Sequence, residues 1–167
     1  MGIPNGRFKI HHEITGDYTI NGKDRVQFLF SANKNIALQE ISKIASGGEL
    51  SRLMLSIKSL LSDSSGLPTI IFDEIDMGVS GEIADKVGNI IKRMSKGMQI
   101  INITHLPQVA CKGDFHYLVY KSDEGESTTA HVKLLNNEER HIEIARMLSG
   151  EELTEAAMEN ARELLKN

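Results

Sequence analysis

Two short apolar runs of this chain each end in polar side chains that could act on a phosphate. Asp73 and Glu74 follow the run TIIF, and Thr104 and His105 follow the run IINI. A carboxylate is a preferred ligand of Mg²⁺, a second carboxylate can act as a base for water, and a histidine can contact a terminal phosphate. Each group also has a structural explanation. An acidic pair often ends a buried strand where it reaches water, and a single histidine is more often a satisfied polar residue than a catalytic one.

A third feature is the stretch SGGE, formed by Ser46, Gly47, Gly48 and Glu49 at the start of an amphipathic segment. A helix N-terminus offers unpaired backbone N–H groups and the positive end of the helix dipole, and glycines there let a phosphate approach the backbone closely. Ser46 would add a hydroxyl donor, whereas Glu49 is better suited to complement the dipole than to contact an anion. Taken alone, the stretch is better explained as a serine-capped helix after a tight turn. Only its occurrence together with the other two features points to phosphate.

The spacing of apolar residues predicts the elements that would bring these groups together. From Glu49 onward apolar residues recur every three or four positions, which predicts a helix with one buried face that ends near residues 62–68. A continuous apolar strand follows at 68–74, of the kind that is buried on both faces of a parallel sheet. A second helix at about 80–95 and a second strand at 98–105 complete a βαβ unit with parallel strands. The carboxyl ends of both strands then lie at one edge of the sheet, where ligands of open α/β sheets bind.

The flanking segments predict further strands and helices around this unit. Residues 7–31 alternate β-prone runs with turn sequences, which predicts an antiparallel β segment, and residues 33–47 are predicted as a loop or short helix. Two more strands are predicted at 117–121 and 128–135, and two helices form the tail, separated near residues 149–152. The predicted fold class is therefore α/β, with a parallel βαβ core, flanking helices and an N-terminal antiparallel β segment.

Composition sets limits on the class of protein. The 167 residues suffice for one domain with a core, so we predict a single domain over 1–167, and 40% apolar with 25% charged residues is typical of a folded soluble chain. The one cysteine, Cys111, excludes an internal disulfide and is expected to be a packed thiol. No apolar run approaches the roughly 20 residues that cross a bilayer, so we predict a cytoplasmic protein with no membrane partner. The net charge of −4 supplies no basic patch that would by itself indicate DNA binding.

Four motifs occur in an order and at distances that indicate one family. They are ASGGELSR, TIIFDEID, MGVSG and ITHLPQ. Together they resemble the C-terminal lobe of ATP-binding-cassette heads of the SMC class, in which they would be the signature motif, the Walker B motif, the D-loop and the switch histidine. Within that class, DEIDMGVSG, THLPQVA and the ending ARMLSGEELTEAAMENARELL resemble the RecN family of bacterial DNA repair proteins.

The resemblance implies a role for each candidate residue and implies ATP and Mg²⁺ as the nucleotide and its metal. Asp73 would hold Mg²⁺, Glu74 would orient or deprotonate the attacking water, and His105 would contact the γ-phosphate. The SGGE stretch at 46–49 would serve a nucleotide that is held by the opposite subunit. ATP would then lie between two heads of a homodimer, and its hydrolysis would release them.

The resemblance also assigns the D-loop and the wider biology. Gly78, Val79, Ser80 and Gly81 fall where the D-loop crosses the dimer interface, and Ser80 stands where many cassette proteins have aspartate. DNA as a partner, association with the nucleoid, and a function in double-strand-break repair and recombination come from the resemblance alone.

A Walker A loop, which requires GxxxxGK followed by Ser or Thr, is not found in this sequence. The nearest segment, GDYTINGKD, has five residues between its glycines and Asp24 where a hydroxyl is needed. Because the family supplies Walker A from an N-terminal lobe, we expect that lobe as a partner, an inactive chain in its absence, and apolar sheet surface left uncovered. Two alternatives stay open: a head lobe of another SMC-like repair ATPase, and a non-catalytic dimerisation or interaction module.

Overall fold

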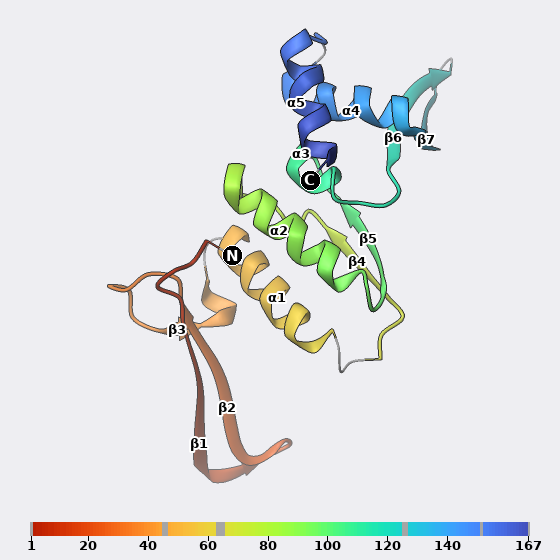
Figure 1. Cartoon of the computed structure of the whole chain (residues 1–167). Helices are drawn as coiled ribbons and strands as arrows, with labels where there is room; N and C mark the ends of the chain where they lie inside the picture. Colours follow the sequence, from red (N-terminus) through yellow and green to blue (C-terminus); the bar gives the residue numbers. More distant parts are fainter. Residues whose placement is uncertain (1, 45–46, 63–65, 125–126, 151, 167) are drawn as a thin grey trace.

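The computed structural model describes residues 2–44, 47–62, 66–124, 127–150 and 152–166. The chain runs from an N-terminal β ribbon through a central α/β layer to a C-terminal hairpin and a pair of helices (Figure 1). This arrangement confirms the predicted α/β class, with a parallel βαβ core, flanking helices and an antiparallel β segment before it.

The N-terminal ribbon is a long antiparallel pair that extends away from the rest of the chain (Figure 1). Strand β1 (Arg7–Thr19) pairs with β2 (Gly22–Ser31), and the short β3 (Gln39–Glu40) pairs with β2 as well. A 3-10 helix, η1 (Ile41–Lys43), follows β3. The segment that was predicted as a loop or short helix therefore contains both a short strand and a short helix.

The central layer consists of two helices and two parallel strands. Helix α1 (Gly47–Leu61) leads to β4 (Thr69–Asp73), and α2 (Gly81–Met94) connects β4 to β5 (Gln99–Ile103). The strands pair in register, from Thr69 opposite Gln99 to Asp73 opposite Ile103. The predicted βαβ unit and the parallel direction of its strands are confirmed.

The main hydrophobic core lies between the strands and the helices. Leu55 of α1, Val87 of α2 and Phe72 of β4 are all buried in it, and Ile70 and Ile100 pack against it from the same side of the sheet. Helices α1 and α2 lie side by side over this side of the sheet (Figure 1). The apolar faces that were predicted for the two helices therefore pack into one shared core.

The prediction that β4 is buried on both faces is wrong. Phe72 is only 7% exposed, whereas Ile71 is 64% exposed and Ile101 and Ile103 of β5 are 46% and 53% exposed. The reason is geometric, because α1 and α2 pack on the side that carries Phe72, and the alternate side chains point to the other side. The sequence is apolar on both faces of the sheet, but among the described residues only one face is covered.

The C-terminal part has a second, smaller core. After the short α3 (Pro107–Ala110), strands β6 (Tyr117–Glu124) and β7 (Ser127–Leu134) form an antiparallel hairpin, followed by α4 (Asn137–Ser149) and α5 (Glu155–Lys166). The core buries Cys111, Ile144, Ala145, Ala157 and Ala161. Burial raises the pKa of the Cys111 thiol, as expected of a packed cysteine. Among the described residues, no helix has the length and apolar character needed to span a bilayer.

Candidate functional site

The candidate site is built at the carboxyl ends of β4 and β5. Asp73 is the last residue of β4 and lies opposite Ile103, the last residue of β5. The backbone N–H of Glu74 donates to the carbonyl of Ile103 at 3.1 Å, which extends the pairing by one residue. The structure therefore brings the acidic pair and the following Thr104 and His105 to the same edge, as the sequence predicted. Asp73, Glu74 and His105 are exposed there.

Glu74 has an unusual backbone conformation. Its φ of 49° makes it the one residue other than glycine that the structure describes in the left-handed region. Its carbonyl accepts the N–H of Met77 at 3.0 Å, so the chain turns sharply as soon as the strand ends. A side chain in this region costs on the order of 1–2 kcal/mol, and such strain is concentrated at functional sites. The sharp turn keeps Glu74 at the strand end and is consistent with a catalytic role for it.

Sequence reasoning missed one residue of this region, Asp76. Its side chain is fully buried, and the hydroxyl of Thr104 donates a hydrogen bond to its Oδ2. The same hydroxyl accepts the backbone N–H of Leu106 at 3.0 Å. The sequence did contain a signal for this role, because Asp76 lies between the apolar residues Ile75 and Met77. A charged side chain in an apolar run must find a partner if it is buried.

The predicted D-loop residues divide into two groups. Val79 is buried in the main core, so its side chain anchors this segment within its own domain. Gly78, Ser80 and Gly81 are exposed, and both glycines have a positive φ, 73° and 54°, that favours glycine. Ser80 is the N-cap of α2 in an extended conformation, and its side chain makes no capping hydrogen bond. The exposed residues are thus free for the interface role that the resemblance implies.

The two glycines at the start of α1 have different surroundings. A Cβ atom on Gly48 would lie 2.9 Å from the carbonyl oxygen of Met77 and 3.7 Å from the Cα of Gly78. A Cβ atom on Gly47 would meet nothing within 4 Å. Gly48 is therefore required by the close approach of the D-loop backbone, whereas Gly47 leaves the helix N-terminus open to a ligand.

The other residues of the predicted signature stretch are only partly described. Ser46 lies outside the described residues. Glu49 lies in the first turn of α1, where its negative charge complements the helix dipole, as expected.

Asp73 is a suitable magnesium ligand by its chemistry. It presents an exposed carboxylate at the strand end, and Mg²⁺ is commonly held by one or two carboxylates together with substrate phosphates and water. The described residues contain no cluster of three or more His, Cys, Asp or Glu side chains that could form a closed metal cage. An exposed carboxylate at a strand end fits a metal that is held together with nucleotide phosphates and water.

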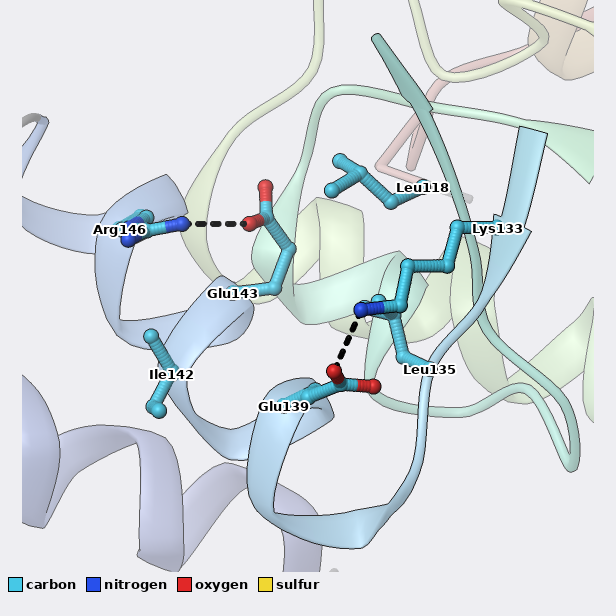
Figure 2. A pocket seen from close by; sticks show the side chains of 7 residues that line it. All are labelled: Leu118, Lys133, Leu135, Glu139, Ile142, Glu143 and Arg146. Carbon is cyan, nitrogen blue, oxygen red and sulfur yellow. Dashed lines mark hydrogen bonds and ion pairs between the residues drawn. The ribbon is translucent and has the colours of Figure 1, made fainter. Parts of the chain in front are cut away.

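A separate pocket of about 210 Å³ lies between the β6–β7 hairpin and α4 (Figure 2). Its charged side chains pair with one another: Lys133 with Glu139 at 2.5 Å, and Arg146 with Glu143 at 3.7 Å. Three apolar residues complete the lining, Leu118, Leu135 and Ile142. The pocket shares no residue with the candidate site and has no surplus charge for a phosphate.

Comparisons with known proteins identify close relatives of the chain. It is 49% identical over 165 residues to the DNA repair protein RecN of Rickettsia prowazekii, 47% over 148 residues to RecN of Bacillus subtilis and 45% over 166 residues to RecN of Haemophilus influenzae. These matches cover 99%, 89% and 99% of this chain but only 30%, 26% and 30% of the relatives. The chain thus spans less than a third of the length of the curated relatives it matches. No protein-family model matches the chain.

Solved structures show a similar fold at lower sequence identity. The Smc head domain of Pyrococcus yayanosii matches with a TM-score of 0.61 and 19% identity, over 96% of this chain and 26% of that one. The Smc head of Pyrococcus furiosus, bound to the C-terminal domain of ScpA, matches with a TM-score of 0.59 and 20% identity, over 87% of this chain and 34% of that one. The sequence relatives and the structural neighbours agree. The chain is homologous to the C-terminal region of the DNA repair protein RecN and has the fold of an SMC head domain.

Proposed function

We propose that this chain forms the part of a RecN-type ATPase head that carries the Walker B carboxylates, the switch histidine and the signature helix, and that it acts in DNA double-strand-break repair and recombination. One observation carries the proposal. The parallel pairing of β4 and β5 places Asp73, Glu74 and His105 at one edge of the sheet with their side chains exposed. A phosphoryl-transfer site needs these groups in such an arrangement.

The proposed chemistry divides between three side chains. Asp73 would hold Mg²⁺, which when bound supplies positive charge against the phosphate oxygens of ATP. Glu74 would accept a proton from the attacking water or orient it, and the turn after β4 holds its backbone at the strand end, directly after Asp73. His105 would donate a hydrogen bond to a γ-phosphate oxygen from the end of the neighbouring strand.

The N-terminus of α1 would serve ATP held by a second head. The open surroundings of Gly47 leave room for a phosphate near the first amides of a 15-residue helix, and Ser46 would add its hydroxyl. Gly78, Ser80 and Gly81 would line the same interface. A structural neighbour from work on the ATP-driven dimerization and DNA-stimulated activation of SMC ATPases supports this assignment. The functional unit would then be a homodimer with ATP between its heads.

The remaining parts of the active unit would come from elsewhere in the protein. An N-terminal lobe would supply Walker A and cover the exposed apolar face around Ile71, Ile101 and Ile103. DNA is the partner that the name of the relatives implies, and the bacterial cytoplasm with its nucleoid is the location. The net charge of −4 does not by itself indicate a DNA-binding surface on this chain.

Hydrolysis of ATP with Mg²⁺ tests the proposal when it is measured for this chain alone and after mixing with a separately produced Walker A lobe. We expect activity only in the mixture, and its loss in Glu74→Gln. Activity in the chain alone would mean that the sequence contains another phosphate loop. Activity in neither sample would instead favour a non-catalytic interaction module.

A further inference from the structure

A single side-chain hydrogen bond joins the two loops that carry the candidate catalytic groups. Glu74 lies on the loop after β4, and His105 lies on the loop after β5. Two residues beyond Glu74, the buried carboxylate of Asp76 accepts a hydrogen bond from the hydroxyl of Thr104, the residue directly before His105. The bond thus links the two loops one and two residues away from the groups that would act on ATP.

The hydroxyl of Thr104 acts both as a donor and as an acceptor. It has one hydrogen, which it gives to Asp76, and it accepts the N–H of Leu106 at 3.0 Å. This second bond closes a local turn around His105, of the type that threonine hydroxyls commonly form. The orientation of Thr104 therefore fixes the backbone on both sides of His105.

Asp76 is unfavourable for stability by itself. Its side chain is fully buried, and its Oδ1 has no hydrogen-bond partner among the described residues. Burying a carboxylate with an unsatisfied oxygen costs free energy that an apolar side chain of similar volume would not. Such a group in a folded protein calls for a reason other than stability. The one described side-chain hydrogen bond of Asp76 is with Thr104, and the link that it makes between the two loops is such a reason.

The backbone around Asp76 also connects the two loops to the D-loop and to the N-terminus of α1. The carbonyl of Asp76 accepts the N–H of Val79 at 3.3 Å, which shapes the D-loop, and the carbonyl of the adjacent Met77 lies against Gly48 of α1. A shift of Asp76 would therefore move the D-loop as well as the two catalytic loops.

We propose that Asp76 is a positioning residue for ATP hydrolysis, which holds the Glu74 loop and the His105 loop in one arrangement through its hydrogen bond with Thr104. This inference rests on the proposed function for its catalytic consequence. The linkage between the two loops does not depend on that function and has its own measurement.

The linkage is tested by hydrogen–deuterium exchange in the full-length protein. Thr104→Val removes the hydroxyl at nearly constant volume, and we expect the amides of Met77 and Val79, on the other loop, to exchange about tenfold faster because Asp76 has lost its partner. Thr104→Ser keeps the hydroxyl and should leave their exchange near wild type. The matched control is Thr69→Val, because the Thr69 hydroxyl donates to Gln99 at 3.0 Å and joins the same two strands at their opposite ends. It should leave these amides unchanged.

The catalytic consequence is tested by steady-state ATP hydrolysis with the same variants. A misplaced catalytic group lowers the rate of the chemical step, so we expect kcat to fall about ten- to a hundredfold in Thr104→Val. KM for ATP should change little, because neither Asp76 nor Thr104 is among the residues that we propose to contact the nucleotide. Thr104→Ser should recover most of kcat, and Thr69→Val should match wild type.

Each result decides a separate question. Unchanged exchange of Met77 and Val79 in folded Thr104→Val would overturn the linkage, and faster exchange with a wild-type kcat would overturn the positioning role. A wild-type protein without ATPase activity would refute the proposed function and with it the catalytic role, while the exchange result would still decide the linkage.

If Thr104→Val fails to fold, Asp76→Asn has the same volume and a weaker bond to Thr104. It should show intermediate changes in exchange and kcat, and wild-type values in both would overturn the inference.

Discussion

The ends of β4 and β5 and the start of α4 use their charged side chains in opposite ways. In the C-terminal part, Lys133 pairs with Glu139, which also completes a capping box at the start of α4 by accepting the N–H of Asn136. At the ends of β4 and β5, Asp73, Glu74 and His105 are exposed, and no described residue forms a hydrogen bond or ion pair with their side chains. Paired charges support the local structure, whereas unpartnered charges at a strand edge are available to a ligand.

The largest expected effect comes from removing the charge of one unpartnered carboxylate. In the full-length protein, Glu74→Gln should lower kcat for ATP about 10²- to 10⁴-fold, because the base for water is lost while the volume is kept. ATP-bound dimers should accumulate and be visible by size-exclusion chromatography. The paired Glu139→Gln is the matched control and should hydrolyse ATP at the wild-type rate. Unchanged turnover in Glu74→Gln would remove Glu74 from the mechanism.

The second prediction compares the stability effects of substituting the two glycines at the start of α1. Gly48→Ala forces a Cβ atom to 2.9 Å from the carbonyl of Met77, so we expect a destabilisation of about 1–3 kcal/mol in spite of the better helix propensity of alanine. Gly47→Ala has open space and should unfold at or slightly above the wild-type temperature. Thermal unfolding of both variants measures this, and equal stabilities would contradict the close packing of the D-loop against α1.

The third prediction concerns the uncovered face of the central sheet. Ile71→Thr and Ile103→Thr keep β-branched side chains at positions that are 64% and 53% exposed, so each should change stability by no more than about 0.5 kcal/mol in the isolated chain. Both should reduce self-association of the chain in sedimentation, because an exposed apolar patch is removed. Phe72→Thr, on the covered face, should instead unfold the chain. A large loss of stability in Ile71→Thr would show that this face is covered.

The smallest effect is expected from the paired charges. The pKa of Glu139 lies below its ordinary value of 4.5. The larger cause is its hydrogen bond with Lys133, and the smaller is the hydrogen bond from the backbone N–H of Asn136. A lowered folded-state pKa stabilises the protein above the unfolded-state pKa, and this stabilisation is lost as pH falls through the folded-state value. Wild type should therefore be slightly more stable than Glu139→Gln at pH 7, and the difference should shrink as pH falls below about 4.5 and vanish below the lowered folded-state pKa. A difference that grows towards low pH would contradict the pairing.

The sequence predicted the central layer well because periodicity and strand-end chemistry are local signals. The parallel strands, the connecting helix and the common edge for Asp73, Glu74 and His105 followed from them. Other features depend on contacts between distant segments. The burial of Asp76 requires Thr104, which lies 28 residues further along the chain, and the need for glycine at position 48 comes from the backbone of Met77. The burial of β4 on both faces was wrongly predicted because an apolar strand is the same in sequence whether or not another segment covers it. The expectation of uncovered apolar sheet surface, which came from the resemblance, agrees with the exposed Ile71.

The central claim is that each ATP site combines the carboxylates of one head with the signature helix of the other. It is tested most directly by mixing two inactive full-length variants, Glu74→Gln and Gly47→Glu, and measuring ATP hydrolysis. In Gly47→Glu the new Cβ atom meets nothing within 4 Å, and the added negative charge would repel phosphate at the helix N-terminus. In a mixed dimer, one site then retains an intact Glu74 and an intact signature helix from opposite subunits. The account predicts recovery of about a quarter of wild-type activity, because half of the dimers of a symmetric protein would be mixed and each would have one of its two sites intact. No recovery in dimers shown to be mixed would contradict the shared site.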